Sequence, residues 1–394
     1  MPRCLSSKQT PMTMDHSLEH HRAYLGNSVS QLPTPSFVVS LPIVQRNIAR
    51  LHQDVSDLGI GFRPHVKTLK TLEITRLMLA NGRYRSVVAS TLAEIRGVLP
   101  LVQEGVLDEC LYSMPVYPGA LPALQQLRKS IHIQLMVDNE QQITCLDNFP
   151  TESTQPWDIF IKIDVGSHRA GIQPDSSLLC RLVAKAEKSH SVNIAGFYCH
   201  AGHSYAGRSP AEAERTLQDE ISGVLIASKL LPATRKLWVH VYVTEISICR
   251  TNPSANMSRT GNFPANDLQQ VSTAVISESD QAVRVIAEIC SVYPDRNEAL
   301  INAGVVALSR DTSAFPGFGY VVGRPEWNVV RLSQEHGILG TTQPKSTADE
   351  AFAVGQRVSL YCNHACITAA AFYVYYIVDE DDVVIDCWVP WKGW

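Results

Sequence analysis

Short apolar runs rich in β-branched residues recur along the first two thirds of the chain, and segments of helical periodicity separate them. The runs that predict strands are Ser36–Ser40, Gly61–Val66, Ser86–Ser90, Glu109–Met114, His132–Val137, Asp158–Val165, Asn193–Cys199 and Lys236–Val243. The first interval carries apolar residues at three- and four-residue spacing, namely Val44, Ile48, Leu51, Val55 and Leu58. Alternating strands and helices predict a parallel sheet, and about eight such units favour an α/β fold of the closed (β/α)8 TIM barrel type.

An open, doubly wound sheet is the alternative arrangement for the same alternation. A dinucleotide-binding sheet of that kind carries a G-x-G-x-x-G turn after its first strand, and no such turn follows Ser36–Ser40. The sequence therefore favours the barrel.

The pattern changes after about residue 270. Strand-like segments now follow one another without long helices between them, at Gln281–Ser291, Ala299–Leu308, Gln356–Tyr361, Phe372–Ile377 and Val383–Val389. This arrangement is typical of a β-rich domain. We therefore expect a flexible tail over 1–30, a barrel over 31–270 and a β-rich C-terminal domain over 271–394.

Composition narrows the classes of function. The chain has 394 residues, 45% of them hydrophobic, and a formal net charge of -4, which argues against a nucleic-acid-binding protein. The apolar runs are too short to cross a membrane, and the polar first thirty residues lack the apolar core of a secretory signal. Ten cysteines without a C-x-x-C pair predict free thiols in a reducing compartment. These features predict a soluble cytoplasmic protein with no nucleic-acid or membrane partner.

Reactive residues of a barrel project from the carboxyl ends of its strands. Lys67 stands directly after the run Gly61–Val66. At that place its amine can be desolvated and made nucleophilic toward an aldehyde, although an ordinary surface lysine at the start of a loop fits the same position.

Two other strand ends are polar. The segment 164–171 follows one strand and combines glycines with Arg169, while His200 and Tyr205 follow the next strand. In the C-terminal part, His364 and Cys366 are two residues apart, so on an extended chain both side chains point the same way. An imidazole and a thiolate on one face can bind zinc, although a bare H-x-C is weak on its own.

Nine short motifs occur together in a fixed order: residues 64–68 (PHVKT), 91–94 (TLAE), 162–171 (KIDVGSHRAG), 199–205 (CHAGHSY), 261–270 (GNFPANDLQQ), 302–311 (NAGVVALSRD), 333–337 (SQEHG), 363–366 (NHAC) and the closing WKGW. With them the chain resembles the eukaryotic D-serine dehydratase and D-threonine aldolase group of fold-type III pyridoxal-phosphate (PLP) enzymes, relatives of alanine racemase. Within that group it resembles the fungal-type D-serine dehydratases.

The resemblance implies a PLP-binding barrel plus a β domain, as a homodimer with a small D-amino acid as substrate. It implies that Lys67 carries PLP as a Schiff base and then acts as general base. It also implies a set of residues around the cofactor, namely His65, Arg169, His200, Tyr205, Gly261 and Asn262. His364 and Cys366 would be ligands of Zn²⁺.

The metal pair separates two activities within the group. D-threonine aldolases resemble this pattern but tend to carry His-x-Asp, whereas the softer Cys366 suits zinc. This favours conversion of D-serine to pyruvate and ammonia, with zinc assisting loss of the β-hydroxyl. A retro-aldol lyase acting on D-threonine is the alternative.

One segment departs from the group. Its members carry a Ser/Gly/Thr-rich loop for the cofactor phosphate after the strand placed here at 236–243, and residues 244–260 contain neither that loop nor a clear helix. This keeps open a third hypothesis, a PLP-binding protein with little turnover. If the last barrel strand comes from this region, Ser36–Ser40 belongs to the β domain instead.

Overall fold

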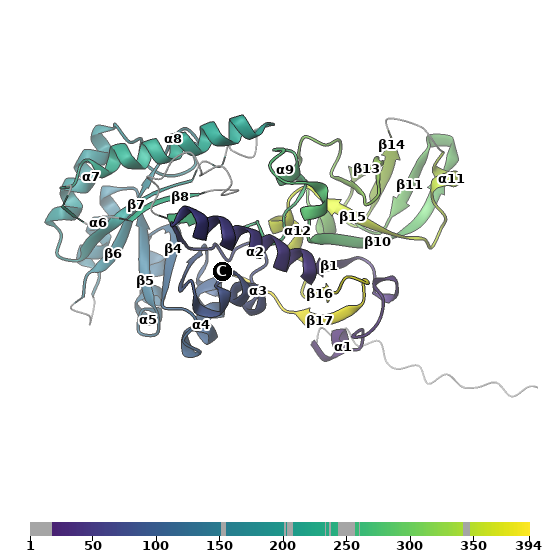
Figure 1. Cartoon of the computed structure of the whole chain (residues 1–394), viewed down its shortest axis with the longest axis horizontal. Coiled ribbons are helices and arrows are strands. Elements are labelled where there is room, and N and C mark those ends of the chain that lie inside the picture. The colour runs from purple at the N-terminus through teal and green to yellow at the C-terminus, as the bar shows by residue number, and fades with distance from the viewer. Residues whose placement is uncertain are drawn as a thin grey trace, which may run out of the picture.

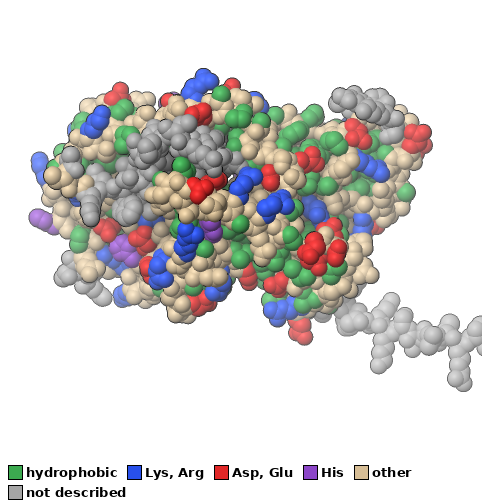
Figure 2. Space-filling view, in the orientation of Figure 1, with side chains coloured by type: hydrophobic (Ala, Val, Ile, Leu, Met, Phe, Trp, Pro, Cys, Tyr) green, Lys and Arg blue, Asp and Glu red, His purple; other side chains and the backbone are tan. Residues whose placement is uncertain are grey.

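The computed structural model describes residues 18–150, 155–200, 202, 208–232, 234–235, 238–242, 257–259, 261–341 and 347–394. Figure 1 shows two bodies side by side, one of helices around strands and one mainly of strands. On the face shown in Figure 2, acidic and basic side chains are interspersed over both bodies. No helix among the described residues is both long enough and apolar enough to span a membrane.

The first body contains an eight-stranded sheet in the order β2-β9-β8-β7-β6-β5-β4-β3. Its strands are β2 (Gly61–Phe62), β3 (Ser86–Ala89), β4 (Glu109–Pro115), β5 (His132–Val137), β6 (Trp157–Ile163), β7 (Val192–Cys199), β8 (Trp238–Tyr242) and β9 (Met257–Arg259). Every neighbouring pair is parallel. A parallel bridge joins His65, just after β2, to Val88 of β3, so the two ends of the strand order are linked. The prediction of a parallel α/β domain is confirmed.

Seven helices of this body connect or flank the strands: α2 (Leu41–Leu58), α3 (Leu72–Met78), α4 (Leu92–Gln103), α5 (Leu121–Leu127), α6 (Glu140–Asn148), α7 (Ser177–Lys188) and α8 (Pro210–Ser228). Four of the five apolar residues whose spacing predicts α2 are buried. The helix ends at Gly59, whose φ of 61° closes it in the left-handed conformation that glycine adopts without strain. The Thr91 side chain caps the start of α4 by accepting from the Glu94 N–H at 3.1 Å.

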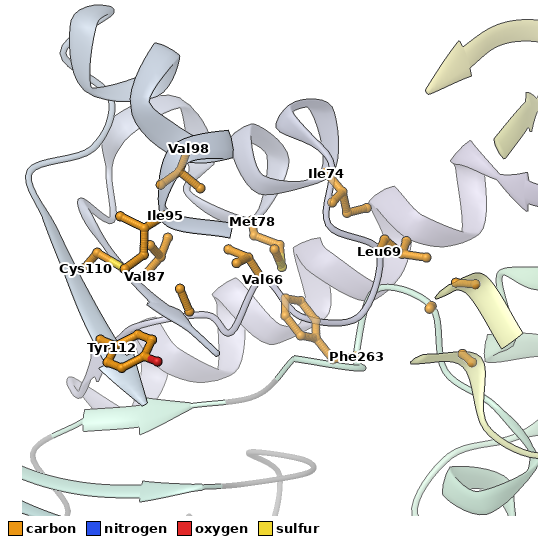
Figure 3. Packing of buried hydrophobic residues seen from close by; sticks show 14 of the residues in the cluster. Val66, Leu69, Ile74, Met78, Val87, Ile95, Val98, Cys110, Tyr112 and Phe263 are labelled. Carbon is orange, nitrogen blue, oxygen red and sulfur yellow. The ribbon is translucent and has the colours of Figure 1, made fainter. Parts of the chain in front are cut away.

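The helices and the sheet share one apolar core. In Figure 3, Val66 lies beside Met78 and Phe263, and Ile95 lies near Val87. Burial of a side chain of this size stabilises the fold by about 1.5–3 kcal/mol. The turn that carries Lys67 is therefore anchored through the buried Val66.

One part of the core enclosed by the parallel sheet is polar, around the buried Arg63. Arg63 is buried and donates to Ser86 Oγ at 3.1 Å and to Gln134 Oε1 at 2.5 Å, and it forms an ion pair with Glu109. Its guanidinium also lies 5.7 Å from the centre of the Phe160 ring. Its members Ser86 and Glu109 are the first residues of β3 and β4, so the network lies toward the amino ends of the strands, away from the end that carries Lys67.

The second body is a nine-stranded sheet in the order β11-β14-β13-β12-β15-β10-β1-β16-β17. Its strands are β1 (Ser36–Ser40), β10 (Val283–Tyr293), β11 (Glu298–Ile301), β12 (Gly319–Val321), β13 (Arg324–Leu332), β14 (Gly337–Thr341), β15 (Arg357–Cys362), β16 (Tyr375–Val378) and β17 (Val384–Trp388). An additional antiparallel pairing of β10 with β11 closes six strands into a small barrel. The prediction of a C-terminal β domain is confirmed.

Counting Ser36–Ser40 among the strands of the parallel sheet was wrong, and its alternative place in the β domain is the observed one. β1 pairs antiparallel with β10 and parallel with β16. All five of its residues are buried, and the Phe37 ring lies 4.9 Å from the Tyr375 ring. The strand reads like a barrel strand because it is covered on both faces.

The expected tail over 1–30 also differs where the structure describes it. Leu18–Arg22 form α1, and Val29–Gln31 form a short 3-10 helix. Gly26 N–H donates to the carbonyl of Val384 in β17 at 2.8 Å. Leu18, Tyr24 and Val29 pack on the β domain, and this apolar contact orders a segment that reads as polar in sequence.

Candidate active site

Lys67 lies in the turn after β2, and hydrogen bonds fix its backbone. Its N–H donates to Nδ1 of His65 at 3.2 Å. Nε2 of His65 therefore carries the ring proton and donates to Ser90 Oγ, 3.1 Å away. The turn is tied in this way to the end of β3, while the Lys67 side chain lines a cavity.

A cavity of about 490 Å³ opens at the carboxyl ends of the parallel strands. Four of the predicted cofactor residues line it, namely His65, Lys67, Arg169 and His200. Its wall also contains polar residues that the sequence did not single out, among them Ser90, Asp138, Lys162 and Tyr198. The position is the one at which parallel α/β barrels place their chemistry.

Lys162 is the most informative of the missed residues. It is 5% exposed, and its Nζ lies 4.2 Å from the centre of the Tyr198 ring. One sequence feature could have revealed it, because it is the only charged residue inside the apolar run Ile159–Ile163. A lysine in a buried strand needs a functional or electrostatic reason.

The electrostatics of the cavity keep His200 neutral. Burial lowers the pKa of His200 well below its usual 6.5, and the nearby cations Lys162, Lys67 and Arg169 lower it further. A neutral imidazole beside several cations leaves the cavity with net positive charge, which suits an anionic ligand.

The loop that carries Arg169 is held by two carboxylates. Asp164 accepts from the N–H groups of Gly166 and His168, each at 3.1 Å. Asp138 accepts from the Gly171 N–H at 3.0 Å. Arg169 is itself exposed, so the loop presents it at the rim of the cavity.

Gly261 and Asn262 lie close to the Lys67 turn. A Cβ added to Gly261 would stand 3.1 Å from Cβ and from the carbonyl oxygen of His65, so backbone meets backbone there. Asn262 Nδ2 donates to Asp267 Oδ2 at 2.7 Å. The same carboxylate oxygen accepts from the N–H of Ala365 at 2.9 Å. This segment thus connects the Lys67 turn with the start of α12 (Ala365–Ala371).

The predicted metal pair lies at that start. His364 is the N-cap residue of α12, its Nδ1 is hydrogen-bonded to a carboxylate oxygen of Asp311, and its side chain also contacts Cys366. Cys366 Sγ lies 3.3 Å from Oγ1 of Thr68, the residue after Lys67. The structure therefore brings the predicted metal pair, which follows β15 of the β domain, close to the turn of Lys67, which follows β2 of the parallel sheet.

The charge around His364 suits a metal ligand. Burial acts to lower the pKa of His364, but Cys366, Asp267 and Asp311 outweigh it and raise that pKa to about 9. The donors fit zinc, because an imidazole and a thiolate are its usual ligands and a carboxylate on Nδ1 orients the imidazole. Among the described residues, no group of three or more His, Cys, Asp or Glu side chains is arranged around a metal position.

Two parts of the sequence hypothesis lie outside the described residues. They are Tyr205 and the segment 243–256, which contains most of the region where the phosphate loop is absent.

Comparison with known families gives two adjoining matches. The alanine racemase N-terminal domain matches residues 39–263, and the putative serine dehydratase domain matches residues 282–378. The fold, the lysine at the strand ends and these matches define an alanine racemase-like, PLP-dependent lyase.

Individual relatives narrow the class. The D-serine dehydratase of Schizosaccharomyces pombe is 42% identical over 95% of this chain and 95% of its own length. That of Saccharomyces cerevisiae is 32% identical over 94% of this chain and 98% of its own. The structure of D-threo-3-hydroxyaspartate dehydratase from Delftia sp. HT23 superposes with a TM-score of 0.84 at 28% identity, covering 93% of this chain and 100% of that one. The chain belongs to the D-serine dehydratase family.

Proposed function

We propose that this chain is a PLP- and zinc-dependent lyase that converts D-serine to pyruvate and ammonia. The observation that carries the proposal is the contact between Thr68 and Cys366 at 3.3 Å, which joins the turn of Lys67 to the segment of His364 and Cys366. The proposal is also supported by full-length relatives named D-serine dehydratase. We infer in addition that the parallel sheet is a closed (β/α)8 barrel and that the protein is a cytoplasmic homodimer.

The residues around the cavity suit PLP. When bound, PLP supplies an electron sink for the carbanion formed at the substrate Cα. Lys67 would hold the cofactor through Nζ and, once released from it, would remove the Cα proton as general base. His200 would lie against the ring as a neutral imidazole, and Arg169 would approach the ring from the rim. His65, Gly261 and Asn262 would line the side that faces the Lys67 turn, and Tyr205 would lie near the substrate.

The metal pair suits the leaving group. Zn²⁺ held by His364 and Cys366 would act as a Lewis acid on the β-oxygen of the substrate, which is otherwise a poor leaving group. Asp311 would hold the His364 ring so that Nε2 faces the metal. A mutant of a D-threo-3-hydroxyaspartate dehydratase was solved in a metal-free form, which supports a metal in that relative.

Reductive trapping tests the cofactor lysine directly. Borohydride treatment of the purified protein followed by peptide mapping should place the pyridoxyl group on Lys67. Lys162 lines the same cavity and is the internal control. An adduct on Lys162, or none in a fully loaded sample, would refute the assignment.

Chelation tests the metal separately. Removal of zinc should stop pyruvate formation while the cofactor absorbance persists, and added Zn²⁺ should restore turnover. An enzyme that works equally well after complete metal removal would overturn the zinc role.

Product analysis separates the alternatives. A retro-aldol lyase would release glycine and acetaldehyde from D-threonine, as the family relation to D-threonine aldolase suggests. A PLP-binding protein without turnover would show cofactor absorbance and no product from any D-amino acid. Pyruvate from D-serine supports the proposed function against both.

A further inference from the structure

The end of the chain leaves the β domain and returns to the parallel-sheet body. After β17, the N–H of Trp391 donates to the carbonyl of Lys70 at 2.8 Å. The Trp391 ring lies on the backbone of Gly97 in α4, where an added Cβ would come within 2.2 Å of ring atom Cδ2. Figure 1 accordingly places the C-terminus beside α3 and α4. Position 97 has room for no side chain while the ring is in place.

The next residue binds the far end of the helix that contains Cys366. Lys392 Nζ donates to the carbonyl of Ala370 at 2.5 Å. Ala370 lies in the last turn of α12, where free carbonyls carry the negative end of the helix dipole and favour a cation. α12 is the helix that contains Cys366 and starts after His364. Its start is held by Asp267 through the Ala365 N–H, and its end is held by Lys392.

The carbonyl that Trp391 binds belongs to a tightly held residue. Lys70 follows Lys67 by three positions and forms a 3.0 Å ion pair with Glu94, whose side chain is almost fully buried. Glu94 also accepts from the Ser90 N–H at 2.6 Å. Lys70 has a φ of 53°, an unusual conformation for lysine that needs such support. The hydrogen bond from Trp391 to the Lys70 carbonyl therefore also restrains the turn that carries Lys67.

We propose that Trp391 and Lys392 form a strap that fixes the Lys67 turn relative to the His364–Cys366 pair. The inference rests on the proposed function, in which both must act on one substrate molecule. The Lys67 turn follows a strand of the parallel sheet, and the His364–Cys366 pair follows a strand of the β domain. Their relative position therefore depends on contacts between the two bodies. Misplacement of a catalytic group by about 1 Å can lower the rate about 100-fold. Both strap residues are positioning residues and touch no reacting atom.

Two substitutions loosen the strap from opposite sides. Gly97→Ala pushes the Trp391 ring away without deleting it, and Trp391→Ala removes the ring. Each should lower kcat on the order of 10- to 100-fold while KM changes by less than about 3-fold. Gly97→Ala should have no further effect in the Trp391→Ala background. Trp394→Ala is the matched control, because that ring is 93% exposed.

Hydrogen exchange gives a readout that does not depend on turnover. In both strap variants, amides of residues 68–70 and 365–371 should exchange faster together, while those of α6 and α7 stay unchanged. Lys392→Met should speed exchange mainly in 365–371, and it serves as the second variant if Trp391→Ala folds poorly.

Unchanged exchange at 365–371 in the strap variants, or an equal rise throughout the chain, would overturn the strap. Absence of D-serine turnover in the unmodified protein would instead refute the proposed function, and the exchange result would still decide the strap.

Discussion

Two levels of the parallel-sheet body arrange their cations in different ways. On the lower level, the Arg63 guanidinium meets Glu109, Gln134 and Ser86, so its donors face acceptors. On the upper level, Lys67, Lys162 and Arg169 line one cavity around a neutral His200. The lower level surrounds one cation with acceptors, whereas the lining of the upper level combines three cations with one carboxylate, that of Asp138.

The difference separates stability from function. A compensated charge belongs to the architecture of the sheet, and its removal leaves the partners unpaired. Cations gathered around one cavity repel one another, and such clusters are retained where a ligand supplies further counter-charge. A phosphate and a substrate carboxylate would supply it here. The upper level should therefore tolerate loss of charge better than the lower level in stability, and worse in activity.

The largest expected effect is on activity at the upper level. Lys67→Ala should lower turnover of D-serine by about 1,000-fold or more, because a positioned general base contributes about 100- to 10,000-fold and the cofactor attachment is lost as well. The midpoint of thermal unfolding should stay close to that of the unmodified protein. An enzyme that retained a tenth of its activity would contradict the role of Lys67.

The lower level should respond in stability. Arg63→Met should reduce the free energy of unfolding by about 3 kcal/mol, the lower end for a broken buried pair, because the Glu109 carboxylate loses its cation but keeps the Gln134 amide and part of its solvent contact. The measurement is denaturant unfolding of the apo protein. Arg85→Met is the control: Arg85 pairs with Asp108 on the surface, and such a pair contributes less than about 1 kcal/mol. Equal losses in the two variants would remove the distinction between the levels.

The sequence predicted the positions of the strands better than the sheet that each strand joins. Apolar β-branched runs placed most strands of the parallel sheet within a few residues, since a strand covered on both faces has a local pattern. That same pattern could not tell which sheet a strand joins, because pairing partners lie far away in the chain. Ser36–Ser40 was therefore counted with the wrong sheet. The two-residue β2 and the ordered segment 18–31 also depend on contacts that local pattern does not contain.

The candidate site shows the same limit. Position after a strand made Lys67 a candidate, although an ordinary surface lysine fitted the same place. The spacing of His364 and Cys366 allowed a zinc pair only weakly, and the family resemblance strengthened both hypotheses. Their approach to Thr68 is a contact over 298 positions of sequence, which no periodicity predicts. Lys162 was within reach of the sequence, as a charge inside an apolar strand. Reading such interruptions as candidate site residues would have found it.

The pH dependence of the free energy of unfolding should report the protonation of His200 on the upper level. The pKa of His200 is lower in the folded protein than its usual 6.5, so below that pH the unfolded chain binds a proton that the folded chain does not. Stability should therefore fall as the pH drops below about 6.5 and continue to fall down to the folded pKa, by at most about 1.4 kcal/mol per pH unit for one proton. Unfolding of His200→Asn between pH 7 and 5 should lack this component. Identical curves for the two proteins would show that the imidazole is not held neutral.

The smallest stability effect should come from substitution of Lys162, which should instead change the pKa of His200 and the affinity for PLP. Lys162→Met keeps the length of the side chain and its contact with the Tyr198 ring, but removes one of the three cations that line the cavity. We expect the free energy of unfolding of the apo protein to change by less than about 1 kcal/mol.

The pKa of His200 in Lys162→Met, measured by NMR, should rise because one of the charges that lowers it is gone. Affinity for PLP should weaken, since an anion has lost a counter-charge. If Lys162→Met destabilised the apo protein as much as Arg63→Met, Lys162 would be a structural cation like Arg63, and the division between the two levels would fail.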